Sequence, residues 1–200
     1  MLKLKYENVT ISGGVASGKN TLLNNLKPYL LPQGWKFTSG GQLLRDFAKE
    51  YVQPVASLAD KKFHNKLDNR TRMLLTKVGH YVIEAWLAGF MARDLKKTLR
   101  VLLICSDDAL RIDRVANRDN ISIEQAKKFI REREEVNFAE WRKIYGNYNF
   151  FDAKYYNLVI DTYSSGPIET VGKVLDKLGY DHNHVNFEKK SVNYRRSHSS

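Results

Sequence analysis

The chain has 200 residues, of which 42% are hydrophobic and 28% are charged, and these values are typical of one globular domain. A single cysteine, Cys105, excludes an intrachain disulfide framework, and we expect a buried, inert thiol in a reducing compartment. No apolar stretch approaches the ~20 residues of a membrane span, and the polar N-terminus lacks the apolar core of a signal peptide. We therefore predict a cytoplasmic protein with no membrane attachment.

The 33 basic residues outnumber the 22 acidic ones, which gives a formal net charge of +11. This excess favours an anionic partner, which is a nucleotide, a nucleic acid or a membrane surface. Composition alone does not separate these partners. We predict a folded domain over residues 1–180 and a disordered basic tail over residues 181–200.

Short apolar strands alternate with helices along the whole chain. The predicted strands cover residues 6–12, 35–39, 81–85, 101–105 and 158–161. The predicted helices cover residues 22–31, a segment from 42 to just before 54, 58–77, a segment ending at 97, 109–118, 121–145 with Ser122 as a cap, and 167–178. This alternation predicts a three-layer α/β domain with a parallel sheet, whose ligands gather at the carboxyl ends of the strands.

The loop after the first predicted strand, ISGGVASGKNTL, carries Gly13, four intervening residues, Gly18 and Lys19. This is the spacing of a phosphate-binding loop, in which small residues let backbone N–H groups surround a polyphosphate. Lys19 adds a positive charge, and the following helix points its positive end at the same anion. Asn20 stands where Ser or Thr normally follows the lysine, so an ordinary glycine-rich turn is the alternative.

Polar residues also follow the second and third predicted strands. Ser39, Gly40 and Gly41 form a turn, and Arg45 lies one helical turn later, where it is placed to hold a second phosphate in a bidentate manner. A solvated surface arginine is the alternative. Glu84, at the end of the third strand, is placed to hold Mg²⁺ or its waters, and a structural carboxylate is the alternative.

Several arginines follow the fourth predicted strand. Arg111, Arg114 and Arg118 are three and four residues apart and share a helix face, and Arg131 and Arg133 lie in the next charged segment. Converging guanidinium groups stabilise the charge that spreads over the oxygens during phosphoryl transfer. Neighbouring glutamates make a solvated, charge-laced helix the alternative for the last two. Together these features predict a kinase for a small phosphorylated acceptor.

The chain resembles the cytidylate kinase-like group of P-loop nucleoside monophosphate kinases over about residues 7–178. The resemblance rests on the segments GGVASGKNT, SGGQLLR, VIEAWLAGF, LRIDRVANRDNISIEQA, REREE with WRKIYG, and YNLVID. It implies a P-loop NTPase fold with a five-stranded parallel sheet, a monophosphate-binding flap near residues 42–78 and a helical lid near residues 115–146. It also implies transfer of the ATP γ-phosphoryl group to a nucleoside monophosphate, most closely CMP or dCMP, with ATP and Mg²⁺ as cofactors.

The motifs and the resemblance together predict four sets of site residues. The ATP-binding set is Gly13, Gly14, Val15, Ala16, Ser17, Gly18, Lys19, Asn20, Thr21 and Arg114. The acceptor-binding set is Ser39, Gly40, Gly41, Arg45, Asp68, Arg70 and Glu84. The catalytic set is Lys19, Arg114, Arg118, Arg131 and Arg133, and the Mg²⁺ ligands, direct or through water, are Thr21 and Glu84.

Two positions depart from the family pattern. Where the family shows Gly-Arg after the strand-end acid, this chain has Ala85-Trp86, so an acceptor-side arginine is missing. Either Arg72 or Arg93 substitutes for it, or the acceptor is not CMP. Asn20 replaces the usual glycine of the loop but leaves Thr21 in place. Another small phosphorylated acceptor, and a weak or lost activity, are therefore alternatives.

A second class of function is a nucleotide-binding protein associated with nucleic acid. The net charge of +11 and the basic, aromatic stretch over residues 141–156 suit stacking and charge neutralisation of single strands. The ordered phosphate-handling motifs favour the kinase. We expect the protein to be a monomer.

Overall fold

The structure, a computed structural model, describes residues 4–51 and 61–181 of the 200. Its centre is a five-stranded sheet in the order β2-β3-β1-β4-β5, and all four pairings are parallel. The strands are β1 (Asn8–Ser12), β2 (Lys36–Ser39), β3 (Tyr81–Glu84), β4 (Thr98–Ile104) and β5 (Leu158–Asp161). The predicted five-stranded parallel sheet is confirmed.

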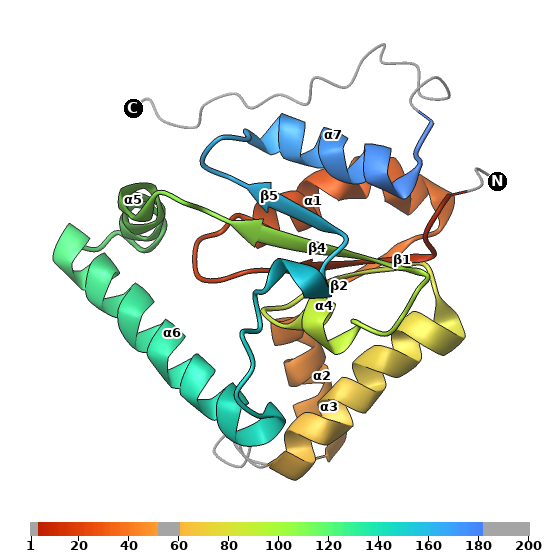
Figure 1. Cartoon of the computed structure of the whole chain (residues 1–200), viewed down its shortest axis with the longest axis horizontal. Helices are drawn as coiled ribbons and strands as arrows, with labels where there is room; N and C mark the ends of the chain where they lie inside the picture. Colours follow the sequence, from red (N-terminus) through yellow and green to blue (C-terminus); the bar gives the residue numbers. More distant parts are fainter. Residues whose placement is uncertain (1–3, 52–60, 182–200) are drawn as a thin grey trace.

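Helices cover both faces of this sheet, as predicted. On one face lie α1 (Lys19–Leu30) and α7 (Pro167–Leu178), and on the other lie α2 (Gly40–Tyr51), α3 (Lys61–Met73) and α4 (Ala88–Met91) (Figure 1). Beyond the carboxyl ends of the strands, α5 (Asp108–Asp119) leads into the long α6 (Ile123–Tyr145), which runs toward the first turns of α3 (Figure 1). The carboxyl edge of the sheet is therefore surrounded by helices.

The main core lies between the sheet and the layer formed by α1 and α7. Val9 and Ile11 of β1 have no exposed surface, because the central strand of a parallel sheet is covered on both faces. Leu22, Leu26 and Leu30 recur every four residues, so they share the face of α1 that packs into this core. This packing fixes the start of α1, and with it the loop between β1 and α1.

The sequence prediction failed at one helix. A helix was expected to run to Lys97, but α4 ends at Met91 and β4 already begins at Thr98. The residues between them form a turn in which both oxygens of Asp94 accept hydrogen bonds of 2.7 Å from Arg72. Thr98 pairs in register with Asn8 of β1, so β4 begins three residues before the predicted strand at 101.

Other predicted boundaries differ by a few residues. The α1 helix begins at Lys19 and not at 22, because Gly18, with a φ of 89°, ends the loop and caps the helix. Residues 74–78 form a π-helical turn, η3 (Leu74–Val78), at the end of α3. The predicted basic tail lies outside the described residues apart from Asp181, as do residues 52–60 of the predicted flap. No helix in the described part of the chain is long and apolar enough to cross a membrane.

Candidate active site

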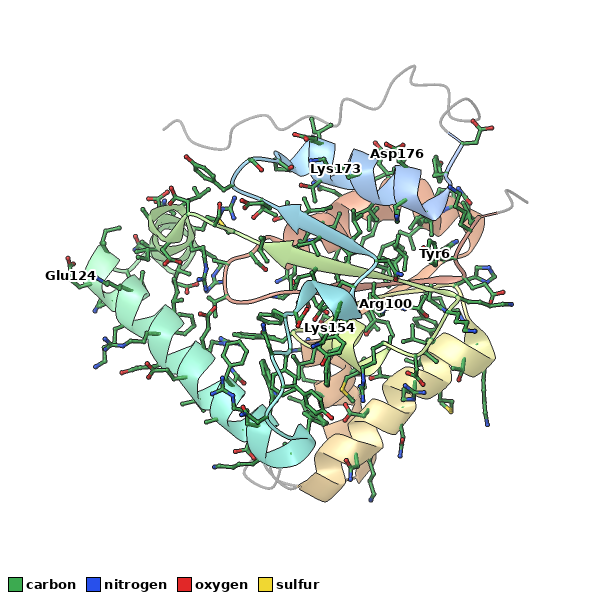
Figure 2. The ribbon with its side chains drawn as sticks, in the orientation of Figure 1. Tyr6, Arg100, Glu124, Lys154, Lys173 and Asp176 are labelled. Carbon is green, nitrogen blue, oxygen red and sulfur yellow. The ribbon has the colours of Figure 1, made fainter. Side chains whose placement is uncertain are left out.

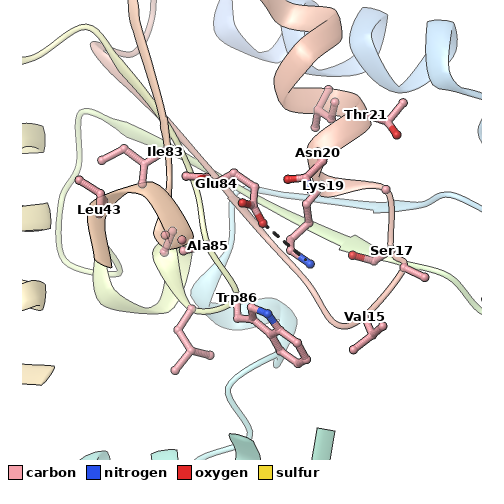
Figure 3. A pocket seen from close by; sticks show the side chains of 18 of the residues that line it. Val15, Ser17, Lys19, Asn20, Thr21, Leu43, Ile83, Glu84, Ala85 and Trp86 are labelled. Atoms are coloured by element: carbon pink, nitrogen blue, oxygen red, sulfur yellow. Dashed lines mark ion pairs between the residues drawn. The ribbon is translucent and has the colours of Figure 1, made fainter. Parts of the chain in front are cut away.

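A cavity of about 930 Å³ opens at the carboxyl edge of the sheet. Its walls come from the loop before α1, from the ends of β2 and β3, and from α2, α3, α5, α6 and the start of α7. Figure 3 shows Lys19, Glu84 and Trp86 facing one another across part of it. This is the place where parallel α/β sheets bind their ligands.

The loop before α1 is shaped by residues that tolerate unusual backbone angles. Gly13 has a φ of 147°, and a side chain there would overlap the carbonyl oxygen of Leu103. Ala16 is also in the left-handed region, with a φ of 56°. Residues 15–21 all line the cavity, whereas Gly13 and Gly14 do not. The loop therefore presents its second half and the first turn of α1 to a ligand.

Lys19 reaches into this cavity from the first position of α1. Its Nζ donates a 2.7 Å hydrogen bond to the carbonyl oxygen of Gly14, lies 4.0 Å from Glu84 Oε1 and is 5.3 Å from the centre of the Trp86 ring (Figure 3). Burial lowers the pKa of Lys19 to about 8, and the negative charge of Glu84 opposes this shift. Burial also raises the pKa of Glu84, against the effect of Lys19. A polyphosphate at this site would stabilise the charged ammonium.

Arg114 ties the loop to the end of β5. Its guanidinium donates to the carbonyl oxygen of Ala16 at 3.1 Å and to Thr162 Oγ1 and O at 3.1 and 2.9 Å. These hydrogen bonds hold the Arg114 side chain in place where it lines the cavity. It is thus preorganised beside the loop.

Two further predicted arginines reach the cavity and one does not. Arg118 lines it and pairs with Asp119 at 2.6 Å. Arg133 lines it from α6, with its guanidinium 6.0 Å from the centre of the Trp86 ring. Arg131 is exposed on α6 and is not among the lining residues. Its catalytic role stays a prediction without support from its position.

The turn between β2 and α2 forms a second polar wall of the same cavity, with Ser39, Gly40, Gly41 and Arg45 along it. Ser39 Oγ accepts the N–H of Gln42 at 3.1 Å, which caps the first turn of α2. A side chain on Gly40 would place its Cβ 2.8 Å from that of Ala85, so glycine permits this close approach to the residue that follows β3. Arg45 is exposed and donates to Gln42 Oε1 at 2.9 Å.

Asp68 and Arg70 were both predicted on the acceptor side, but they occupy different places. Asp68 lines the cavity from α3 and accepts a 2.7 Å hydrogen bond from Tyr145 Oη of α6. Arg70 does not line the cavity. Neither Arg72 nor Arg93, the predicted substitutes for the missing arginine, lines the cavity. Arg72 is held by Asp94, and Arg93 lies 4.4 Å from the centre of the Phe90 ring and donates to the Phe90 carbonyl oxygen.

Aromatic residues that the sequence analysis did not assign to the site form another part of the wall. Trp86 lies edge-on to Trp141, with 5.3 Å between the ring centres, and Phe129 and Tyr145 also line the cavity. Phe129, Arg133, Trp141 and Tyr145 all come from α6, but at about 100° per residue the first and last project about 160° apart around the helix. No single helical stripe in the sequence therefore marks them as lining residues.

The predicted Mg²⁺ ligands fit the ion in part. Glu84 offers a buried carboxylate, the hard oxygen ligand that Mg²⁺ prefers, and Thr21 offers a hydroxyl. Both line the cavity, but Thr21 points away from Glu84 in Figure 3. Within residues 4–51 and 61–181, no group of three or more His, Cys, Asp or Glu side chains is arranged to hold a metal. A metal here would depend on ligand oxygens and water, as is usual for Mg²⁺ bound with phosphates.

The chain is similar to a family of enzymes and to several solved structures. A model of the cytidylate kinase-like family matches residues 35–164. The cytidylate kinase of Ignicoccus hospitalis is 33% identical over 174 residues, which cover 84% of this chain and 98% of that protein. That of Thermococcus sibiricus is 34% identical over 165 residues, or 80% and 81% of the two chains.

Solved structures share the fold at low sequence identity. An uncharacterized protein from Eubacterium ventriosum superposes with a TM-score of 0.67 at 13% identity, over 87% of this chain and 99% of that one. A shikimate kinase from Bacteroides thetaiotaomicron gives a TM-score of 0.54 at 15% identity, over 86% and 98%. These two likenesses concern the fold alone.

Proposed function

The chain belongs to the cytidylate kinase-like family and is a nucleoside monophosphate kinase, and we propose that it transfers the γ-phosphoryl group of ATP to CMP or dCMP. The products are ADP and the cytidine or deoxycytidine diphosphate. One observation carries the proposal: a single cavity joins the phosphate loop with the turn that carries Arg45. Both substrates can therefore meet in one space.

The donor side of this cavity suits the phosphates of ATP. The backbone N–H groups of residues 16–21 and the positive end of α1 surround the polyphosphate, and Lys19 supplies a charge inside a buried site. Arg114, Arg118 and Arg133 approach from the other side. Their guanidinium groups stabilise the charge on the transferring phosphoryl group as the transition state forms.

The acceptor side suits a nucleoside monophosphate. Arg45 and the turn at residues 39–41 hold the acceptor phosphate, and Asp68 with Tyr145 lies at the far wall, where the base is placed. An oxygen of the acceptor phosphate attacks the γ-phosphorus in line while the bond to ADP breaks. This oxygen is already an anion, so alignment and charge stabilisation contribute more than a protein base.

Magnesium is part of the proposal. Glu84 would hold the ion through water, and the ion would neutralise charge on the phosphates. The buried position of Glu84 beside Lys19 supports this role, because a cation close by would keep its carboxyl group ionised.

An acceptor panel tests the proposed function. Purified protein is mixed with MgATP and, in turn, CMP, dCMP, UMP, AMP or GMP, and ADP and the new diphosphate are quantified. We expect CMP or dCMP to react fastest. If no monophosphate accelerates ADP formation, the proposal is wrong, and preference for another base would overturn the substrate assignment alone.

A matched pair of lysine variants shows whether phosphoryl transfer takes place in this cavity. Lys19→Ala should abolish turnover, because it removes the charge that meets the phosphates. Lys27→Ala, on the same helix but outside the cavity, should leave turnover unchanged. Full activity in Lys19→Ala would show that the loop is misassigned.

Nucleic-acid binding is the second candidate, supported by the net charge of +11. Several basic side chains away from the cavity are already paired with carboxylates, among them Lys154 with Asp152 and Lys173 with Glu169. Figure 2 shows these two lysines on separate elements, the 3₁₀ helix η4 (Ala153–Tyr155) and α7. Micromolar binding with a steep dependence on salt would support this candidate.

A further inference from the structure

The phosphate loop holds a residue in a backbone conformation that its side chain disfavours. Ala16 has a φ of 56°, in the left-handed region where a Cβ crowds the following carbonyl oxygen. Such a residue persists only where the surrounding contacts over-determine its conformation, and these residues gather at functional sites.

Side chains from α5 and α6 take up both backbone polar groups of the preceding residue, Val15. Its N–H donates to Glu134 Oε1 at 3.1 Å, and its carbonyl oxygen accepts from Arg111 Nε at 3.2 Å. Arg111 and Glu134 also form an ion pair with each other. We call these two residues the loop clasp. They come from different helices and meet on one residue of the loop.

Packing brings the clasp to the loop. The Val15 side chain is buried in a small apolar cluster with Val115 of α5 and with Ala126 and Ile130 of α6. Close approach is required, because a Cβ on Gly14 would lie 2.6 Å from Glu134 Oε1. Gly14 does not line the cavity, so the clasp supplies a reason for a glycine at this position.

We propose that Arg111 and Glu134 are positioning residues that hold the phosphate loop in the shape that binds ATP. Neither side chain lines the cavity. They act through Val15, which fixes the backbone on one side of Ala16, while Arg114 holds the carbonyl oxygen of Ala16 on the other side. The inference rests on the proposed function only in naming ATP as the ligand. ATP binding then depends on the packing of α5 and α6 against the loop.

A second substitution, at Ala16, should suppress the effect of breaking the clasp. If the clasp is needed because Ala16 is strained, a glycine at position 16 should let the loop keep its shape without the clasp, since glycine adopts a positive φ without a steric penalty. Ala16→Gly should therefore restore ATP binding to a protein whose clasp is broken. A contact between Glu134 and the nucleotide itself would not be replaced in this way.

The test measures ATP affinity by isothermal titration calorimetry in the full chain. Glu134→Ala should weaken ATP binding about tenfold, the scale of one lost charge-assisted hydrogen bond. Glu134→Gln keeps an acceptor for the Val15 N–H and a similar side-chain shape, so its ATP affinity should lie between that of Glu134→Ala and that of the unaltered protein. Glu135→Ala, an exposed neighbour on α6, is the matched control and should bind as the unaltered protein does. Ala16→Gly combined with Glu134→Ala should recover most of the loss.

Amide hydrogen exchange adds a readout without any nucleotide. Exchange at Val15 should accelerate in Glu134→Ala and stay unchanged in Glu135→Ala. Equal ATP affinity in Glu134→Ala and the unaltered protein, or no recovery with Ala16→Gly, would overturn the inference. If the unaltered protein binds no ATP, the proposed function fails. Hydrogen exchange at Val15 then decides separately whether the clasp holds the loop.

Discussion

At the scale of single residues, the chemistry of the donor site depends on the charge of Lys19. Burial favours the neutral amine and Glu84 favours the ammonium, and burial prevails, so the pKa falls from 10.5 to about 8. The ammonium is therefore charged below about pH 8 and neutral above it. A neutral lysine attracts phosphate far less.

The first prediction concerns this titration. In the free enzyme, kcat/KM for ATP should decline as the pH rises through about 8, because the proton on Lys19 is lost there. Lys19→Arg keeps its charge over this range and should abolish the decline, even if it lowers the absolute rate. A decline at the same pH in Lys19→Arg would assign the titration to another group.

The second prediction concerns the contact between Gly40 of α2 and Ala85, the residue that follows β3. Gly40→Ala should destabilise the protein by about 1–3 kcal/mol, since the new Cβ would lie 2.8 Å from that of Ala85. Ala85→Gly should relieve the contact in the double variant. Urea unfolding of the two single variants and the double variant measures the coupling. Additive changes, with no relief, would show that the contact is not what requires glycine.

Single residues also show the limit of reasoning from the sequence. Lys19, Glu84 and Arg45 line the cavity because spacing after a strand determines where a side chain lies at a sheet edge. Trp86 stands where the family resemblance predicts an arginine, and only the structure reveals that its ring lies beside Lys19 and Arg133. Arg72 and Arg93 do not line the cavity, because Asp94 in the turn after α4 pairs with Arg72 and Arg93 lies against the ring of Phe90 in α4. Local sequence does not contain these contacts.

At the scale of secondary-structure elements, α6 contributes four side chains to the cavity wall and is fixed at its start by a cap. Ser122 accepts the N–H of Gln125 at 3.2 Å, and the Gln125 side chain accepts the N–H of Ser122 at 2.9 Å. This reciprocal capping box satisfies backbone donors that a helix start leaves unpaired. Local sequence contains this signal in full, so the cap at Ser122 was predictable.

The third prediction tests this cap. Ser122→Ala should lower the free energy of unfolding by about 1 kcal/mol, the usual cost of losing an N-cap side chain. Urea denaturation measures the change. The control is Ile123→Ala, a substitution at the next residue, whose side chain is exposed and does not cap the helix. A loss no larger than that of Ile123→Ala would show that the cap contributes little.

Elements that depend on distant pairing were predicted less well. The start of β4 and the end of α4 are set by register with β1, which no local pattern contains. In contrast, β5 and α7 lie where they were predicted, because turn residues and Pro167 mark their boundaries. Helices with caps or prolines were therefore predicted more accurately than segments whose ends depend on the sheet.

At the scale of the whole molecule, two helices that lie far apart in the sequence meet at the wall of the cavity. Tyr145 at the end of α6 donates to Asp68 of α3, and this bond joins the predicted lid to the predicted flap. Burial and the neighbouring carboxylate raise the pKa of Tyr145, so its hydroxyl stays protonated and remains a donor. The acceptor side is thus completed by contact between distant segments.

The fourth prediction concerns this bridge. Tyr145→Phe keeps the ring but removes the donor, and it should raise the KM for the acceptor several-fold while the KM for ATP changes little. Tyr148→Phe, an exposed tyrosine beyond α6, is the control. Steady-state kinetics with each substrate varied in turn measures both values. A selective rise in the KM for ATP would contradict the placement of the acceptor.

The central claim is that one cavity holds ATP and a cytidine monophosphate together. A bisubstrate analogue that links adenosine and cytidine through five phosphates tests it in one titration. The account predicts a single site, tighter binding than either substrate alone, and competition with both ATP and CMP. Binding no tighter than that of ATP, or competition with only one of the two substrates, would contradict it.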